Sequence, residues 1–387
     1  MVTSAPPHTL VITNDYPPRP GGIQTFIFEM VRRFPSDQVT VLTSNFDGAA
    51  EFDESNPWRV VRTDDQVLLP TGKTLTLAQQ LIEQTGSTQV VFGAAAPLAL
   101  MVRRLRTLGI ERVVSISHGH EAGWASTPVT RRAIRTIAAQ SDWFTYLGSY
   151  TREAIQAAAR PQDLSKFRQL TPGVDTAEFH PSRKASGDIL RSSIGFGTRP
   201  TIVCVSRLMA RKGQDRLIRA LPGIKSEVPG AALVIVGTGP YRKKLEALAE
   251  SLDLTRDIHF TGKVPQEQLA DWYAAGDVFA MPCRTRNAGW DVEGLGIVFL
   301  EASATGLAVV AGDSGGAPDA VLHNETGLVV DGRSVDAVAE SIIQLLKDPT
   351  QADAMGRAGR RWVEQAWTWD HSYKRLTAML SGLDPDA

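Results

Sequence analysis

Two acidic residues, Glu293 and Glu301, flank a glycine-rich turn and an apolar run. The turn, Gly294-Leu295-Gly296, lets backbone N–H groups approach a ligand because glycine carries no Cβ. The apolar run predicts the start of a buried helix, whose first N–H groups have no partner within the helix and attract anions. Eight helical residues would span about 12 Å, placing one carboxylate beside the anion and one beyond it. A nucleotide-sugar diphosphate, with hydroxyls at both ends, suits this pattern; the alternative is a helix start with two incidental acids.

A basic pair, Arg207 and Lys212, follows the apolar run 201–205, which predicts a strand. Open α/β sheets bind their ligands at the carboxyl ends of strands. Arginine offers a planar fork and lysine a compact charge, so the pair suits a diphosphate, although a lone basic pair is more often a solvated loop. Gly237 and Gly239 follow another predicted strand, at 233–236. Phosphate-binding residue types at three strand ends of one domain favour a phosphate site.

The amino-terminal half has its own glycine loop, in which Gly21 and Gly22 precede a helix expected from about Gln24. These glycines would let the backbone meet a phosphate or a sugar. The loop is not a G-x-G-x-x-G motif, so a dinucleotide site is poorly supported. His118 ends another predicted strand and precedes a glycine, which makes it a candidate ligand contact. The alternatives are a plain turn and a structural histidine.

Short apolar runs alternate with helical patterns along the whole chain, which predicts βαβ units and parallel sheets. We therefore expect an α/β protein of two tandem Rossmann-like domains, residues 1–180 and 181–365, with a cleft between them. A linker is expected from Pro172 to Asp175 and from Pro181 to Gly187. The predicted strands are 10–13, 39–43, 90–92, 113–117, 144–147, 169–170, 201–205, 233–236, 258–260, 278–281, 308–311 and 327–330.

Composition limits the class of protein. The chain has 387 residues, 43% hydrophobic and 21% charged, with a net charge of −1, which is typical of globular domains and does not indicate nucleic-acid binding. Both cysteines, Cys204 and Cys283, lie in apolar runs and are expected to be reduced core residues. Neither a signal peptide nor a membrane span of about 18 apolar residues is evident, so a cytoplasmic protein is expected.

The glycine and basic motifs occur in order along nearly the whole chain and resemble those of the retaining GT-B glycosyltransferases of family four. The departure is Pro172-Gly173-Val174-Asp175, where members often have Asn-Gly-Val-Asp at the domain junction. The matching segments are Gly21-Gly22-Ile23, Ser117-His118-Gly119, Arg207 to Gly213, Leu233 to Gly237, Asp277-Val278-Phe279 with Pro282, and Glu293 to Ala302.

The resemblance implies a GT-B fold, a nucleotide sugar held mainly by the carboxyl-terminal domain, and a final helix, 366–387, that crosses back to the amino-terminal domain. It implies that Arg207 and Lys212 hold the diphosphate, that Glu301 holds the ribose, and that His118 and Glu293 face the sugar. His118, Arg207, Lys212 and Glu293 are then the catalytic candidates. The nucleotide-sugar residues are Gly21, Gly22, Arg207, Lys212, Gly237, Lys263, Val264, Glu293, Gly294, Leu295, Gly296 and Glu301. The residues assigned to the acceptor are Asp15, Tyr16, Arg19 and His120.

Within that family the chain is similar to the actinobacterial GDP-mannose-dependent phosphatidylinositol mannoside mannosyltransferases, especially those adding the second mannose at the inositol 6-position. A lipid acceptor implies contact with the inner face of the plasma membrane. The span 101–136 contains seven arginines against two acidic residues, which predicts a basic amphipathic helix for this contact. The alternative is a solvated basic face.

The expected chemistry is transfer of mannose from GDP-mannose with retention, in which the departing phosphate oxygen takes the acceptor proton on the same face of the sugar. No cofactor or metal is expected, because the only D-x-D motif, Asp384 to Asp386, lies in the tail. Three rivals remain. A transferase for a UDP-linked sugar would share every motif, a sugar-nucleotide epimerase would need neither an acceptor site nor a lipid-facing basic patch, and a non-catalytic nucleotide-sugar sensor would keep Arg207 and Lys212 but would not need Glu293.

Overall fold

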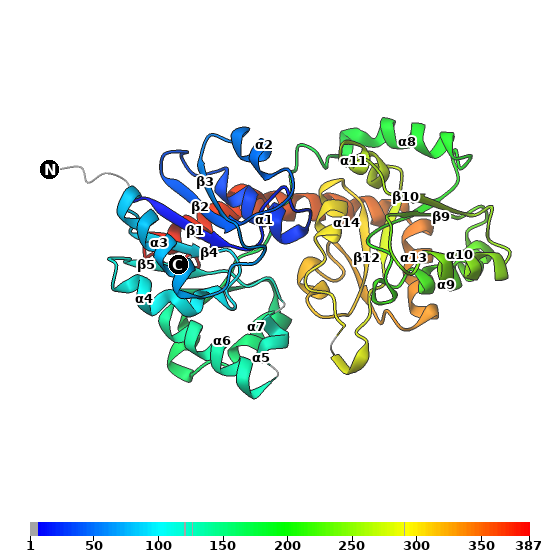
Figure 1. Cartoon of the computed structure of the whole chain (residues 1–387). Helices are drawn as coiled ribbons and strands as arrows, with labels where there is room; N and C mark the ends of the chain where they lie inside the picture. The colour runs from blue at the N-terminus through cyan, green and yellow to red at the C-terminus, as the bar shows by residue number, and fades with distance from the viewer. Residues whose placement is uncertain (1–6, 120, 126, 290) are drawn as a thin grey trace. The chain divides into compact units, whose positions relative to one another are not determined.

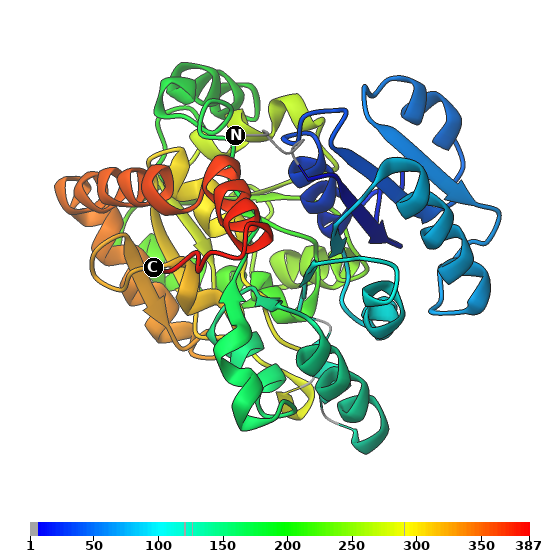
Figure 2. The ribbon, with the colours of Figure 1, turned by 90° about the vertical axis from the view of Figure 1, so that its left-hand side faces the viewer.

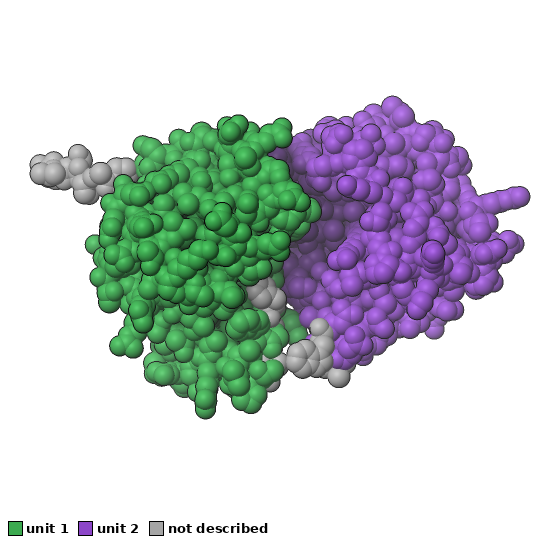
Figure 3. Space-filling model, in the orientation of Figure 1, with its two compact units in different colours: residues 1–173, 369–387 green, residues 174–368 purple. Residues whose placement is uncertain are grey.

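The computed structural model describes residues 7–119, 121–125, 127–289 and 291–387. The chain divides into two compact units, residues 1–173 with 369–387 (unit 1) and residues 174–368 (unit 2; Figure 3). Each unit is a parallel sheet covered by helices (Figure 1), which confirms the expected α/β class with two Rossmann-like domains. In the described part of the chain, no helix is long and apolar enough to cross a bilayer.

Unit 1 contains a seven-stranded sheet in which every neighbouring pair is parallel. From edge to edge the strands are β3 (Arg59–Thr63), β2 (Val39–Ser44), β1 (Thr9–Thr13), β4 (Gln89–Phe92), β5 (Arg112–Ser115), β6 (Trp143–Tyr146) and β7 (Phe167–Gln169). The helices are α1 (Gly22–Val31), α2 (Ala49–Glu54), α3 (Gly72–Thr85), η1 (Leu98–Met101), α4 (Val102–Arg106), α5 (Glu121–Ala125), α6 (Pro128–Gln140), α7 (Ser149–Gln156), η2 (Pro161–Lys166) and α15 (Trp369–Leu380).

Alternation along the strands of unit 1 divides its core between the two faces of the sheet. Leu10 and Ile12 of β1 join a cluster with α3, α4 and α6, whereas Val11 joins a cluster with α1 and α15. Figures 1 and 2 show these two groups of helices on opposite sides of the sheet. The last helix of the chain is therefore part of the core of unit 1, through Leu376 and Met379.

Unit 2 contains a six-stranded parallel sheet of the doubly wound type. Its strands, from edge to edge, are β10 (Ile258–Gly262), β9 (Ala232–Val236), β8 (Thr201–Val205), β11 (Val278–Met281), β12 (Ala308–Gly312) and β13 (Gly327–Val330). The helices are η3 (Pro181–Arg183), α8 (Lys184–Ser193), η4 (Ala210–Lys212), α9 (Gln214–Glu227), α10 (Arg242–Ser251), α11 (Gln266–Ala274), η5 (Asn287–Gly289), α12 (Ile297–Ala304), η6 (Ala317–Ala320), α13 (Val335–Lys347) and α14 (Pro349–Ala366).

The units divide at residues 173 and 368, whereas the sequence placed the boundaries at 180 and 365. Val174 and Phe179 are buried in the core of unit 2, and the Val174 N–H donates to the Trp367 carbonyl at 2.7 Å. Residues 174–180 are therefore held by unit 2 rather than exposed between the units.

Three sequence-based expectations are wrong at the level of secondary structure. The segment 181–187, expected to be a linker, forms η3 and the start of α8, where Gly187 lets α8 approach the backbone of Ala274 closely. The strand β3 was missed because it is a partly exposed edge strand with an arginine at position 59 and another at 62. The basic span 101–136 is not one helix, since it contains α4, β5, α5 and most of α6.

Candidate active site

The carboxyl edge of the unit 2 sheet brings several loops together beside the point where strand order reverses, between β8 and β11. Doubly wound sheets bind ligands at this point. Backbone hydrogen bonds join the loops: Leu208 N–H donates to the Thr238 carbonyl at 2.9 Å, and Arg284 N–H donates to the Arg211 carbonyl at 2.8 Å. The loops after β8, β9 and β11 therefore form one connected surface.

A cavity of about 430 Å³ lies at the ends of β8, β9 and β10, and four of the predicted nucleotide-sugar residues line it. Gly237 is required there, because its φ is +128° and a Cβ would lie 2.2 Å from the Ser206 carbonyl oxygen. The structure thus brings these residues together at one cavity, as the sequence analysis implied. They are Arg207, Gly237, Lys263 and Val264.

Two uncompensated cations stand at this cavity. The side chains of Arg207 and Lys263 are exposed, and neither forms an ion pair with any residue that the structure describes. Their charges are free to attract an anion, and their exposure means that neither is needed to hold the fold.

Lys212 differs from Arg207, although the sequence treated them as a pair. Both Lys212 and Glu293 are buried, 9% and 6% exposed, and the lysine Nζ lies 2.6 Å from Glu293 Oε2. The two catalytic candidates from separate motifs are therefore in direct contact. A bound phosphate that pairs with Lys212 would leave the Glu293 carboxylate able to accept other hydrogen bonds. A ligand anion can therefore replace Glu293 as the partner of this lysine.

A second buried ion pair, which the sequence analysis missed, holds the loop that carries Lys212. Arg284, after β11, makes a bidentate contact with Asp215 of α9, at 2.8 Å and 3.0 Å. Gly213 packs so closely on this loop that a Cβ would lie 1.9 Å from the Pro282 carbonyl oxygen. An arginine just after an apolar strand was the available sequence signal.

A glycine loop after β12 also supports Glu293 and was not singled out in the sequence. Gly316 N–H donates to the Glu293 carbonyl at 2.9 Å, and Glu293 N–H donates to Ser314 Oγ at 3.3 Å. A Cβ on Gly315, whose φ is +57°, would lie 2.1 Å from the Glu293 carbonyl oxygen. The run Ser314-Gly315-Gly316 directly follows an apolar strand, so the same reasoning that found Gly237 could have found it.

Glu301 lies on the second turn of α12, and Glu293 lies before the helix begins at Ile297. The spacing of about 12 Å for eight helical residues therefore does not apply between them. Tyr273 Oη donates to Glu301 Oε2 at 2.5 Å. Burial raises the pKa of the Glu301 carboxyl from 4.5 to about 7, although the hydrogen bond from Tyr273 acts to lower it.

Unit 1 places its candidates at the carboxyl edge of its own sheet. Gly22 begins α1 and Gly21 precedes it, both exposed, while Gln24 of this helix donates to Asp15 Oδ1 at 2.7 Å. His118 Nε2 lies 2.5 Å from the Gly93 carbonyl oxygen, which only accepts, so this nitrogen carries the proton.

The acceptor assignments differ in their outcome. Tyr16 is wrong as a side-chain contact, because it is 1% exposed and its hydroxyl accepts from Trp58 Nε1 at 2.8 Å. Arg19 lies over the Phe46 ring, at 5.3 Å from its centroid, and remains available. His120 lies outside the described residues.

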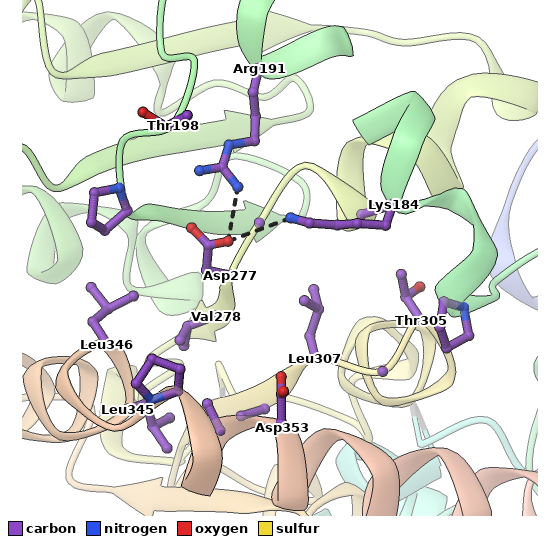
Figure 4. A pocket seen from close by; sticks show the side chains of 18 residues that line it. Lys184, Arg191, Thr198, Asp277, Val278, Thr305, Leu307, Leu345, Leu346 and Asp353 are labelled. Carbon is purple, nitrogen blue, oxygen red and sulfur yellow. Dashed lines mark hydrogen bonds and ion pairs between the residues drawn. The ribbon is translucent and has the colours of Figure 1, made fainter. Parts of the chain in front are cut away.

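A larger cavity, about 490 Å³, lies at the opposite, amino-terminal edge of the unit 2 sheet (Figure 4). Figure 4 shows Lys184 and Arg191 both directed at Asp277, with contacts of 3.5 Å and 2.8 Å. The Asp277 Oδ2 also accepts from Thr201 N–H at 2.8 Å, which fixes the start of β8 beside β11. The two cations that line this cavity, Lys184 and Arg191, are therefore already paired with an acidic residue.

Several other sequence-based assignments can be located. Cys204 and Cys283 are free and buried as expected, and burial raises both thiol pKa values to about 12. The tail carboxylates Asp384 and Asp386 pair with Arg168 and Arg375, as parts of the surface of unit 1. Within the described ranges, no group of three or more His, Cys, Asp or Glu residues is arranged to hold a metal ion.

Two family models match the chain. The model of the glycosyl transferases group 1 covers residues 188–362, and that of Glycosyltransferase Family 4 covers residues 20–178. In fold, the chain is similar to the crystal structure of Anabaena HepE in complex with UDP, with a TM-score of 0.81, 18% identity, and coverage of 97% of this chain and 100% of that one.

Two curated relatives match over nearly their whole length. The chain is 48% identical over 381 residues to the GDP-mannose-dependent alpha-(1-6)-phosphatidylinositol monomannoside mannosyltransferase of Mycobacterium tuberculosis, covering 97% of this chain and 98% of the relative. It is 42% identical over 380 residues to the GDP-mannose-dependent monoacylated alpha-(1-6)-phosphatidylinositol monomannoside mannosyltransferase of Corynebacterium glutamicum, covering 97% and 98%.

Proposed function

The chain belongs to family four of the glycosyltransferases, and we propose that it transfers mannose from GDP-mannose to a phosphatidylinositol mannoside. The product would carry an α-1,6 linkage, with the new mannose at the inositol 6-position. One observation carries the proposal: relatives that are 42–48% identical over nearly their full length are named for this reaction. The charged loops of unit 2 supply chemistry that suits it.

The donor diphosphate would bind where unit 2 offers positive charge. Arg207 is exposed and unpaired among the described residues, and Lys212 is held beside Glu293. As the bond between the mannose C1 and the β-phosphate oxygen breaks, negative charge grows on that oxygen, and both cations stabilise it. The acceptor oxygen bonds to C1 on the same face, and its proton passes to the leaving phosphate oxygen.

The rest of the donor would be held by the surrounding loops. Lys263 and Val264 line the cavity with Arg207 and would frame the base. Glu301 would accept from the ribose hydroxyls. Glu293, once Lys212 turns to the phosphate, would accept from the hydroxyls of mannose, with Gly294, Leu295 and Gly296 close to the phosphate. None of these roles calls for a metal ion.

Unit 1 would serve the sugar and the acceptor. The Gly93 carbonyl accepts from His118 Nε2 and so fixes the orientation of this ring, which we assign to the transferred sugar. Gly21 and Gly22 offer backbone groups at an exposed helix start, and Asp15 and Arg19 offer side chains for a polyhydroxylated acceptor.

A lipid acceptor requires contact with a membrane surface, and α4 with α6 is the best-supported contact. These helices contact each other, and Arg103, Arg104 and Arg132 are exposed cations without an ion pair among the described residues. Val129, at the start of α6, is 79% exposed and supplies an apolar side chain beside these charges. Attraction to anionic lipids would then hold the protein at the inner face of the plasma membrane.

A transfer assay tests the proposed function. The purified protein should convert GDP-mannose and phosphatidylinositol monomannoside into a dimannoside whose second mannose is α-linked at the inositol 6-position, as read by mass spectrometry and NMR. UDP-glucose should give much less product. A β-linked product would rule out the same-face mechanism, and absence of transfer to this acceptor would rule out the substrate assignment.

A further inference from the structure

Tyr273 is a fully buried tyrosine whose ring is fixed by two other aromatic side chains. The ring lies stacked with Phe279, with centroids 5.6 Å apart and planes at 26°, and meets Phe179 edge-on at 5.5 Å and 84°. A tyrosine enclosed in this way has few alternative rotamers. The position of its hydroxyl is therefore set by the core of unit 2.

That hydroxyl ends on a single carboxylate oxygen. It donates to Glu301 Oε2 at 2.5 Å, while Glu301 Oε1 accepts no hydrogen bond from the described residues and is not sealed from solvent. A carboxylate has two oxygens that both accept. The core thus takes one of them and leaves the other without a hydrogen bond from the described residues.

We propose that Tyr273 is a positioning residue that orients Glu301 so that its free oxygen accepts from the ribose hydroxyls of the nucleotide. This inference rests on the proposed function, which assigns the ribose to Glu301. Tyr273 touches neither the substrate nor the reacting atoms, and acts only through Glu301.

The charged and titratable groups around Glu301 leave Tyr273 as its hydrogen-bonding partner. Glu178, whose carboxylate raises the pKa of Glu301, offers only repulsion. Arg360 of α14, which packs against α12, donates to the carbonyls of Phe179 and Ala304. Without the Tyr273 hydroxyl, Glu301 would lose the contact that fixes its rotamer and favours its ionised form.

Tyr273→Phe removes the hydroxyl and keeps the ring. We expect it to weaken GDP binding about tenfold, in line with loss of a hydrogen bond to a charged group. Binding of 2′,3′-dideoxy-GDP should be unchanged, because that ligand has no ribose hydroxyls for Glu301 to accept from. The midpoint of the pH dependence of GDP binding should also move upward, since the hydrogen bond that lowers the Glu301 pKa is gone.

The experiment measures GDP and 2′,3′-dideoxy-GDP affinity by calorimetry for wild type, Tyr273→Phe and Tyr16→Phe. The last is the matched control, because it removes a buried tyrosine hydroxyl from unit 1, and its preference for GDP should equal that of wild type. Should Tyr273→Phe fail to fold, Phe179→Leu replaces it: this variant removes the ring that meets Tyr273 edge-on and keeps the hydroxyl, and it should reduce the preference for GDP, whereas an unchanged preference would overturn the positioning role.

The outcomes separate the inference from the function on which it rests. Equal binding of the two nucleotides by wild type would remove the ribose role of Glu301 itself. A wild-type preference that persists in Tyr273→Phe, or an equal loss of both nucleotides in that variant, would overturn the positioning role alone. Loss of the preference with retained dideoxy-GDP binding is the result we predict.

Discussion

The two edges of the unit 2 sheet both carry a cavity and an ion pair, yet they differ in charge balance. At the amino edge, Lys184 and Arg191 share Asp277, and the larger cavity, about 490 Å³, has its cations matched. At the carboxyl edge the cavity is about 430 Å³, and Arg207 and Lys263 face it with no acidic partner in the described ranges. Cavity volume alone would place an anion-binding site at the amino edge, whereas the unpaired cations place it at the carboxyl edge.

This difference shows which property marks the site. A cation already paired with a carboxylate gains little from a ligand anion, whereas an unpaired cation beside a close backbone approach is ready for one. The Lys212–Glu293 pair is intermediate between these two cases. Its two side chains are paired with each other, but a nucleotide sugar would offer a phosphate to the lysine and hydroxyls to the carboxylate. The carboxyl edge is therefore distinguished by cations that are unpaired, or whose acidic partner a ligand can replace.

Removing one buried cation from each edge should give the largest difference between the two edges. Lys212→Met should reduce turnover at least ~100-fold and also lower the free energy of unfolding by about 3 kcal/mol, because Glu293 is left buried and unpaired. Arg191→Met should also lower stability, by about 2 kcal/mol, but should leave turnover unchanged. Steady-state kinetics and urea unfolding of both variants check this; reduced turnover in Arg191→Met would contradict it.

Arg207 should affect turnover without affecting stability. Arg207→Ala should reduce kcat/KM about 100-fold, because charge on the leaving diphosphate loses a donor. Its free energy of unfolding should stay within about 0.5 kcal/mol of wild type, since the side chain is exposed and unpaired among the described residues. Near-normal turnover would remove Arg207 from the donor site.

Unpaired cations also lie on the surface of unit 1. Arg103→Ser with Arg104→Ser should weaken binding to anionic vesicles about 30-fold at low salt, at about 1 kcal/mol per cation, with little effect at high salt. Arg106 is left unchanged because it already pairs with Asp142 at 2.6 Å. Vesicle sedimentation measures the effect, and GDP affinity should not change. Equal sedimentation of variant and wild type would make this a solvated basic face.

The smallest effect expected is a pH dependence of GDP binding that arises from Glu301. Its pKa is raised to about 7 by burial, so the carboxyl is neutral below that pH and ionised above it. Only the ionised form accepts with both oxygens, so GDP affinity should rise up to about tenfold between pH 6 and pH 8. Calorimetry across this range tests it, and Glu293→Gln, which spares the ribose, should show the same rise while its mannose transfer falls.

The fold was largely predictable because buried parallel strands are continuous apolar runs. All six strands of unit 2 were located within two residues of their ends. The strand β3 was missed because an exposed edge strand needs no apolar run, and its Arg62 is instead held by Asp53. The helix at 184–193 was missed because a Pro/Ser/Gly composition resembles a linker, while packing of Gly187 against Ala274 decides the outcome.

The site was predictable as a set of residue types but not as a set of partners. Motif spacing placed Arg207 and Lys212 after one strand, yet only the fold shows that one is exposed and the other is bound to Glu293. Tyr16 was assigned to the acceptor, and its burial against Trp58 comes from contacts distant in sequence. Tyr273 carries no motif, and its effect depends on α11 and α12 lying side by side.

One titration tests directly whether unpaired positive charge at the carboxyl edge of unit 2 binds the donor diphosphate. GDP and guanosine are titrated into wild type, Arg207→Ala and Arg191→Met by calorimetry. We expect Arg207→Ala to weaken GDP binding at least ~10-fold while guanosine binds as in wild type, and Arg191→Met to match wild type for both ligands. GDP affinity that is unchanged in Arg207→Ala, or reduced as much in Arg191→Met, would contradict it.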